Sequence, residues 1–206
     1  RTRSMKRLLE KIRYRDPARA AQTIARLAAA VPAQVQTGIR SLLMASPDPD
    51  QALHMLGRLF DERPAAFDRL TASVAGLSFL IAVFSYSRFL SEVVIQNPDW
   101  LDVLTHSGDM DRVLSAEEYR ERLASLLASE EFLDPDASQT PSALTFARFR
   151  RRELLRILLR DVQGYCTLAE TAEELSNLAD AILEAACQGI YRDLARRHGE
   201  PVLDGE

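Results

Sequence analysis

The stretch from Leu144 to Asp161, LTFARFRRRELLRILLRD, carries the clearest structural pattern in the chain. Arginines recur in it at every fourth position, at Arg148, Arg152, Arg156 and Arg160. Because an α-helix has about 3.6 residues per turn, this spacing predicts a helix with the four arginines along one slowly drifting ridge. Like charges at this spacing repel one another, so we expect the ridge to face an anionic partner.

The composition indicates a folded domain rather than a secreted, membrane or nucleic-acid-binding chain. The 206 residues are 47% hydrophobic and carry a formal net charge of -4, which argues against non-specific nucleic-acid binding as the main task. Residues 1–15 are basic but lack the apolar core of a signal peptide. The longest apolar run, Leu77 to Phe84, is far too short to span a membrane. Only two cysteines occur, which suits a reducing compartment, so we expect a cytoplasmic protein.

Helix boundaries are marked along most of the chain, and almost no strand pattern competes with them. Proline stands at an expected first helical position after four capping residues: Asp16, Asp48, Asn97 and Thr140. Capping boxes and terminal glycines are expected at Ser115 with Glu118, Thr167 with Glu170, Gly164 and Gly199. These signals predict an all-α fold, a multi-helix bundle of roughly ten helices.

The same signals suggest a division of the chain into three parts. Residues 1–128 are expected to form an N-terminal helical bundle, with stacked hairpins as one arrangement, and residues 129–140 a loop. The most apolar segment, Leu77 to Val94, should pass through the core. Residues 141–206 should form a long antiparallel hairpin, with helices over about 141–163 and 167–198, because Gly164 permits a tight turn between them.

The second helix of this hairpin offers the arginines an internal partner. Polar residues follow a three-four spacing along it, at Glu170, Glu173, Asn177, Asp180 and Glu184. The antiparallel register would pair Arg160 with Glu170, Arg156 with Glu173, and Arg148 with Glu184. An apolar stripe on the two helices predicts a set of buried residues: Leu154, Leu158, Leu175, Leu178 and Ile182. An internal acidic stripe and an external anion both stay open as partners of the ridge.

Residues with the spacing of a catalytic or metal site are scarce. His54, His106 and His198 are too far apart in sequence for a metal-ligand motif, and Cys166 and Cys187 form no CxxC pair and are expected to be small buried hydrophobes. The one candidate metal pair is Asp109 with Asp111, since paired carboxylates can hold Mg²⁺. It lacks flanking strands and leads directly into the Ser115 capping box, so we favour a turn and assign no metal ligand and no catalytic residue.

The arginine-rich stretch and its continuation resemble a known family. The segments FARFRRRELLRILLRDVQG, TLAETAEELSNLADAILEAA and YRDLARRHGEP are similar to the helical region of bacterial glutamine synthetase adenylyltransferases, bifunctional enzymes that add AMP to glutamine synthetase and remove it. The upstream segment SRFLSEVVIQNPDWLDVL is also similar to that family. The resemblance covers about Ser85 to Pro201, and it is only loose from Met5 to Gly76.

The resemblance implies a role but transfers no catalytic residue. In the family this helical region precedes a nucleotidyltransferase domain with a GMGKLGG-like turn and a Gly-Ser-Asp-x-Asp carboxylate pair, and neither motif occurs here. We therefore expect an N-terminal segment, from the deadenylylating half of a longer enzyme, that positions the catalytic domain and the protein substrate. The family implies Mg²⁺ and ATP for the full-length enzyme but no cofactor in this segment. It also implies glutamine synthetase, a PII-type signalling protein and the enzyme's own catalytic domain as partners.

Two other classes of protein compete with this interpretation. A free-standing all-helical interaction module would explain the helices but not the family-like stretch. A small independent enzyme would have to use Asp109 and Asp111, and we rank it last.

Overall fold

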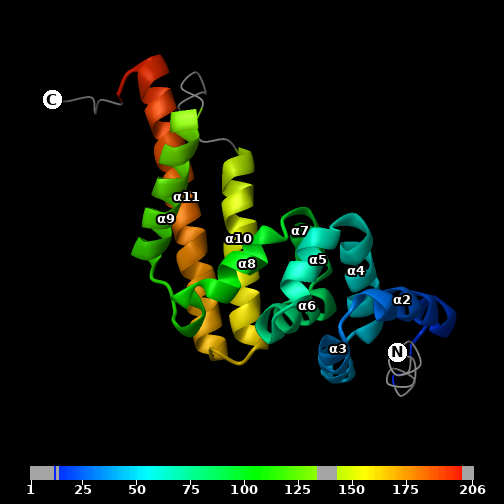
Figure 1. Ribbon diagram of the computed structural model, residues 1–206. Coiled ribbons are helices and arrows are strands. Elements are labelled where there is room, and N and C mark those ends of the chain that lie inside the picture. The colour runs from blue at the N-terminus through cyan, green and yellow to red at the C-terminus, as the bar shows by residue number, and fades with distance from the viewer. Residues whose placement is uncertain (1–11, 13, 134–142, 201–206) are drawn as a thin grey trace. The chain divides into compact units, whose positions relative to one another are not determined.

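The computed structural model describes residue 12, residues 14–133 and residues 143–200, and all the regular secondary structure within them is helical. Ten α-helices and one short 3₁₀ helix follow one another without a strand in this part of the chain (Figure 1). They are α2 (Pro17–Ala30), α3 (Ala33–Ala45), α4 (Pro49–Glu62), α5 (Pro64–Thr71), α6 (Val74–Tyr86), α7 (Arg88–Gln96), α8 (Asp99–His106), η1 (Gly108–Asp111), α9 (Ala116–Leu133), α10 (Ala143–Val162) and α11 (Leu168–His198). The all-α prediction is confirmed, and α10 and α11 are the two longest helices described, as expected.

The described residues form two compact units, and the first contains residue 12 and residues 14–110 together with residues 158–163. Its central element is α6, which packs against α3, α4, α5, α7 and α8. Nine of the thirteen residues of α6 are buried, so this helix is apolar on nearly every side, as expected of a helix in the middle of a core. The apolar segment from Leu77 to Val94 therefore does pass through a core, as two helices separated at the N-cap Ser87.

Polar side chains complete the backbone hydrogen bonding of α6. Gln51 of α4 donates to the carbonyl oxygen of Phe84 at 2.7 Å, and the Ser85 hydroxyl donates to the Ile81 carbonyl at 2.6 Å. From the end of α10, Gln163 donates to the Ser78 hydroxyl at 2.9 Å. Buried carbonyls and hydroxyls left unpaired would each cost free energy, so these contacts allow α6 to end inside the unit.

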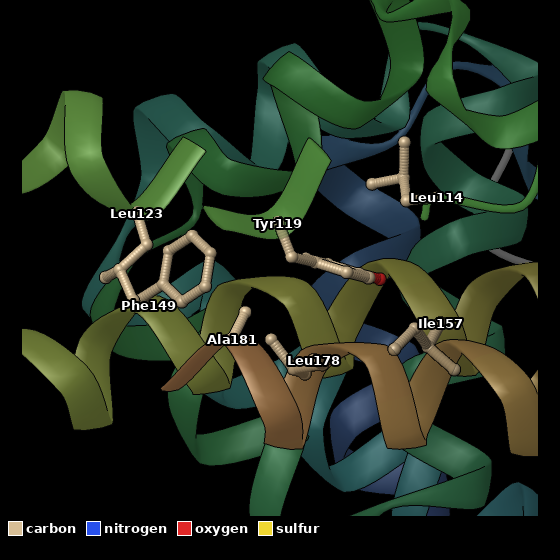
Figure 2. Close-up of a cluster of buried hydrophobic side chains, with 7 residues drawn as sticks. All are labelled: Leu114, Tyr119, Leu123, Phe149, Ile157, Leu178 and Ala181. Carbon is tan, nitrogen blue, oxygen red and sulfur yellow. The ribbon is translucent and has the colours of Figure 1, made fainter. Parts of the chain in front are cut away.

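The second compact unit contains residues 111–133, 143–157 and 164–200, and its helices form a three-helix bundle. Helix α9 packs along α11, and α10 packs against both, antiparallel to each (Figure 1). All three helices contribute to one hydrophobic cluster, shown in Figure 2. Its buried members are Leu114, Tyr119, Leu123, Phe149, Ile157, Leu178 and Ala181. The long hairpin predicted from the sequence is thus two-thirds of a bundle whose third helix is α9.

Most of the predicted helix boundaries are present in the structure, but the prediction that Asn97 caps α8 is wrong. Pro98 is the N-cap of α8, and the Asn97 side chain instead donates to the Val93 carbonyl oxygen at 3.2 Å. Asp16 and Asp48 cap α2 and α4, and both capping boxes are formed. Gly164 and Gly199 have φ of 74° and 81°, which only glycine adopts without strain. The expected cap at Thr140 lies outside the described residues.

The loop predicted over residues 129–140 begins later than expected. Helix α9 continues to Leu133, so the first five residues of the predicted loop are helical. The reason is that Ser129 to Leu133 contains no helix breaker, and the first proline is Pro135. Residues 134–142 lie outside the described part of the chain.

No single described helix is long and apolar enough to cross a membrane. Helices α5 and α6 reach that length and composition only as a pair bent by 118°.

The apolar stripe predicted on α10 and α11 is only partly buried. Leu178 is 2% exposed, and Leu154 and Ile182 are partly buried against the same cluster. Leu158 is half-buried, whereas Leu175 is 42% exposed, so the prediction of a buried Leu175 is wrong. At about 100° per residue, Leu175 lies about 60° around the helix from Leu178 and about 100° from Glu174, so it falls at the edge of the buried face. The buried face of α11 follows Glu174, Leu178 and Ala181 instead.

Truncation of Leu178 should therefore destabilise the bundle far more than truncation of Leu175. Leu178→Ala removes buried methyl groups and leaves a cavity, and we expect a loss of about 2–5 kcal/mol in the free energy of unfolding. Leu175→Ala on the same helix serves as the control and should cost well under ~1.5 kcal/mol, because much of its side chain already meets water. Chemical denaturation of both variants measures the difference. Equal losses would contradict the assignment of the buried face.

Candidate functional site

The four arginines of α10 do not form one surface. Arg148 and Arg152 are exposed, whereas Arg156 and Arg160 are each 1% exposed. Four residues advance an α-helix by roughly 40° more than one full turn, so the ridge drifts by roughly 120° from the first arginine to the last. The drift is large enough to carry the second pair into the protein interior while the first pair stays in solvent.

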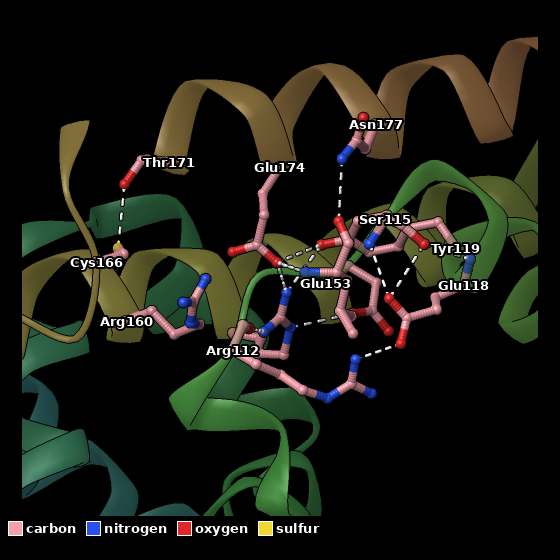
Figure 3. Close-up of polar contacts among 12 residues, drawn as sticks. Arg112, Ser115, Glu118, Tyr119, Glu153, Arg160, Cys166, Thr171, Glu174 and Asn177 are labelled. Carbon is pink, nitrogen blue, oxygen red and sulfur yellow. Dashed lines mark hydrogen bonds and ion pairs between the residues drawn. The ribbon is translucent and has the colours of Figure 1, made fainter. Parts of the chain in front are cut away.

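Arg156 is the centre of a buried polar network in the three-helix bundle. Its partners Tyr119, Glu153 and Glu174 are labelled in Figure 3. Its guanidinium donates to the Tyr119 hydroxyl at 3.0 Å, to the Arg112 carbonyl oxygen at 3.3 Å and to the Glu174 carboxylate. A second carboxylate, that of Glu153, lies 3.6 Å from the Arg156 Nε. Each of the three helices therefore supplies a group to this network.

Glu174 is the anionic partner that the arginine spacing calls for, and it is 0% exposed. One carboxylate oxygen also accepts from the backbone N–H of Leu114 at 2.9 Å and from the Tyr119 hydroxyl at 3.3 Å. A buried charge is tolerated only when it is paired and hydrogen-bonded, and Glu174 meets both conditions.

The three-four spacing of acidic residues predicts Glu173, and not its neighbour Glu174, as the partner of Arg156. Glu173 is exposed in the structure, and adjacent residues differ by about 100° around a helix, so only one of the two can face the bundle. A signal was available: Glu174 stands four residues before Leu178 and seven before Ala181, on the apolar face. A carboxylate in an apolar stripe four positions ahead of a core leucine is the pattern of a buried ion pair.

Burial and charge shift the ionisation of this network in ways that preserve it. Burial raises the pKa of the Tyr119 hydroxyl, so the phenol stays protonated and able to donate. Burial alone would lower the pKa of Arg156, but the Tyr119 and Glu174 contacts outweigh it and raise the pKa above its ordinary value. Arg156 therefore stays charged, and its role is to cross-link helices rather than to exchange protons.

Arg160 bonds within the first compact unit. Its Nε donates to the carbonyl oxygen of Met110 at 3.0 Å. Met110 is the buried middle residue of the Asp109–Asp111 triplet, which forms the 3₁₀ helix η1. The contact between this triplet and Arg160 is therefore made by the backbone carbonyl of Met110.

The candidate metal pair does not gain further ligands in the described part of the chain. Asp109 is half-buried and Asp111 is exposed, and the described residues contain no group of three or more His, Cys, Asp or Glu side chains that could hold a metal ion. The pair therefore has no third such side chain beside it in this part of the chain, and we derive no catalytic step from it.

The other members of the predicted acidic stripe have different partners from those expected. Glu184 pairs with Arg120 of α9 at 2.5 Å instead of with Arg148. The Asn177 side chain donates to the Leu114 carbonyl oxygen at 3.0 Å. Glu170 closes the capping box at Thr167, and Asp180 is exposed. The new partners Arg120 and Leu114 lie in α9 and just before it. The sequence pattern of the α10–α11 hairpin alone does not predict that α9 packs against α11.

The cysteines are both free, and their burial differs from the expectation. Cys166 is half-buried, with its sulfur 3.2 Å from the Thr171 hydroxyl oxygen. Cys187 is exposed on α11, so the prediction that it is a buried hydrophobe is wrong.

The region that contains this network matches a known protein family. A family model described as glutamate-ammonia ligase adenylyltransferase matches residues 77–206, which is more than half of the chain and includes all three helices of the bundle. The chain belongs to this family. The resemblance inferred from the arginine-rich stretch is thereby confirmed.

Individual relatives agree with the family match. A bifunctional glutamine synthetase adenylyltransferase/adenylyl-removing enzyme of Streptomyces coelicolor is 36% identical over 152 residues, which are 70% of this chain and 14% of the relative. The enzyme of the same name from Thioalkalivibrio sulfidiphilus is 32% identical over 124 residues, which are 59% of this chain and 12% of the relative. The chain therefore spans only a small part of the length of these relatives. No solved structure matches the chain.

Removal of one partner of the buried pair should destabilise the bundle strongly. Arg156→Met leaves Glu174 buried without its main counter-charge, and we expect a loss of about 3–5 kcal/mol in the free energy of unfolding. The double variant Arg156→Met with Glu174→Leu should recover much of this loss, because a buried ion pair can often be replaced by apolar residues of similar volume. Thermal or chemical unfolding of both variants measures the coupling. No recovery in the double variant would show that the pair is not the source of the effect.

Glu118 should make the bundle sensitive to acid. The Ser115 backbone N–H and the Arg112 side chain lower the pKa of Glu118 from 4.5 to about 2. A lowered folded-state pKa contributes stability above the unfolded value, and that contribution is lost as pH falls from about 4.5 to about 2. Glu118→Gln should therefore show a shallower loss of stability over this range than the unsubstituted protein. Parallel slopes in a series of unfolding measurements would contradict this role.

Proposed function

We propose that this chain is a helical accessory segment of a bifunctional enzyme that adenylylates and deadenylylates glutamine synthetase. The observation that carries the proposal is the family match over residues 77–206, supported by relatives whose names state both activities. Because the chain spans only 12% and 14% of these two relatives, most of such an enzyme lies beyond this segment. A free-standing interaction module has no reason to carry the family sequence, and we rank it second.

The arginine ridge has a buried pair and an exposed pair, and this arrangement supports a role in positioning other parts of the enzyme. Arg156 and Arg160 are occupied inside the protein, and they fix α10 within its surroundings. Arg148 and Arg152 lie one turn apart on the same helix and are exposed. Two guanidinium groups one turn apart on a rigid helix can bind carboxylates or phosphates on another surface with defined geometry. We propose that this exposed pair contacts an anionic surface of the catalytic domain or of glutamine synthetase.

The chemistry of AMP transfer would be supplied by the catalytic domain. Phosphoryl and nucleotidyl transfer depends on positioning and on carboxylate-held metal ions, and the described residues offer no such ligand set. A requirement for Mg²⁺ and ATP, and regulation by a PII-type protein, are therefore proposed for the longer enzyme and are assigned to no residue of this segment.

Charge reversal at Arg152 tests the positioning role. Arg152→Glu should leave the melting temperature of the 206-residue chain nearly unchanged, since an exposed ion pair contributes only about 0–1 kcal/mol. In the longer enzyme the same change should lower the rate of AMP release from adenylylated glutamine synthetase at least about 10-fold, if one charge-assisted contact worth ~1.4 kcal/mol or more is lost.

Arg150 provides a matched control on the same helix. It is also exposed, but it lies about 160° around α10 from Arg152, so Arg150→Glu makes the same change of charge on another face. Its effect on the rate should be several-fold smaller. Equal effects of the two substitutions would indicate a general electrostatic influence, and full activity of Arg152→Glu would contradict the proposed contact.

A further inference from the structure

Helices α2 and α4 of the first compact unit pack together, and two kinds of polar contact join them. In the second half of α2, the Arg26 guanidinium donates to both carboxylate oxygens of Asp61 on α4, at 2.9 Å and 2.7 Å. About two turns earlier on both helices, Arg19 donates instead to the Nδ1 of His54 at 3.2 Å. At this second contact an arginine meets an imidazole, which offers it no negative charge.

The contact with Arg19 fixes the state of His54. Arginine has only hydrogen-bond donors, so the Nδ1 of His54 must accept and the imidazole is neutral. Burial and then the positive charges of Arg19 and Arg58 lower the pKa of His54, with a smaller contribution from Arg88. The Glu92 carboxylate acts in the opposite direction but does not cancel these effects. His54 therefore lies where positive charge is in excess.

A cavity of about 270 Å³ lies between α2 and α4 at this contact. Its charged lining consists of three arginines and one aspartate: Arg19, Arg26, Arg58 and Asp61. Gln22, Thr23 and His54 also line the cavity, and each can donate a hydrogen bond. Both helices therefore direct donors toward this space, whereas its one carboxylate is already held by Arg26.

Gly57 of α4 allows the two helices to approach closely beside the cavity. A Cβ at this position would lie 2.8 Å from the Thr23 Cγ2 and 3.4 Å from the Arg26 Nη2. The first of these distances is too short for two carbon atoms, so a larger residue would move Thr23 away from α4. Glycine therefore keeps Thr23 and Arg26 against α4, where they form one wall of the cavity.

Within the described part of the chain, Arg19 is the arginine of this cavity whose charge no carboxylate neutralises. Arg58 donates to Glu62 at 2.9 Å and to Glu92 at 2.5 Å, and Arg26 is held by its own aspartate. The Arg19 side chain is exposed, and its contact with His54 adds no negative charge. An external anion in the cavity would supply that charge, and it would also favour the protonated form of His54.

We propose that the cavity between α2 and α4 binds a small oxyanion, a phosphate group, with Arg19 as its principal partner. A phosphate group offers three strong acceptor oxygens, so it can accept from an arginine, an imidazole and neutral donors at the same time. The site does not rest on the proposed function. The residues that line it precede residue 77, where the family match begins, and the test needs only this chain.

Histidine NMR of the purified 206-residue chain tests the site, because His54 lines the cavity whereas His106 and His198 do not. Inorganic phosphate, added at neutral pH and constant ionic strength, should shift the His54 imidazole resonance saturably and leave the resonances of the other histidines unchanged. Sulfate, which stays a dianion during the titration, should raise the pKa of His54 well beyond the change in sodium chloride of equal ionic strength. A His54→Gln variant assigns the resonance.

Removal of the Arg19 charge should weaken the binding of inorganic phosphate. Arg19→Gln loses one charge-assisted contact, and we expect the dissociation constant to rise at least about 10-fold. Because the side chain is exposed, helix content by circular dichroism should not change. Arg63→Gln is the matched control, since it removes the same charge at an exposed position outside the cavity and should leave binding intact.

Glycerol phosphate is the second probe and distinguishes two sources of the phosphate group. Tighter binding than that of inorganic phosphate would identify a phosphate monoester as the ligand, and equal or weaker binding would identify free phosphate. The absence of a saturable His54 shift, or parallel shifts of all three histidines, would overturn the site. Equal weakening by Arg19→Gln and Arg63→Gln would also overturn it, because a general charge effect would then explain the binding.

Discussion

The ion pair between Arg156 and Glu174 is the contact on which the three-helix bundle depends. Both side chains are removed from water, and each would be strongly unfavourable inside the protein without the other. The Tyr119 hydroxyl and the Leu114 backbone N–H complete the hydrogen bonding of the pair. The network therefore joins all three helices and the residues just before α9 at one point. The hydrophobic cluster around it is non-directional, whereas this network accepts only one register of the helices.

Helices α6 and α11 are both rich in apolar residues, but they differ in how much of that apolar surface is buried. Helix α6 is apolar on nearly every side and is buried as the centre of its unit. Helix α11 is apolar on its buried face and also along a stripe of exposed residues. The buried face packs around Leu178 and Ala181, and the exposed stripe runs through Leu183. A protein that keeps such an exposed stripe is organised for contact with another surface, and the exposed arginines of α10 extend that organisation to anionic partners.

Family membership and the physical structure describe different aspects of this segment. The family match covers the bundle and identifies the class of longer enzyme to which such segments belong. The structure shows a scaffold whose charged groups are used partly for internal cross-linking and partly at the surface. That division is consistent with a segment that holds other parts of an enzyme in place, and it explains why an arginine-rich helix can be stable without an external anion.

The sequence by itself determined the helices, their caps and the need for an anionic partner. Local signals decide these features: a proline or glycine restricts its own backbone, and a four-residue spacing places side chains along one ridge. The tertiary structure decided which arginines are buried, that Glu174 rather than Glu173 meets Arg156, and that Arg120 of α9 takes Glu184. These outcomes depend on the rotation of each helix about its axis and on the packing of α9, a helix distant in sequence. A rotation of about 100° exchanges one glutamate for its neighbour, and helical periodicity within one segment leaves that rotation undetermined until its neighbours are in place.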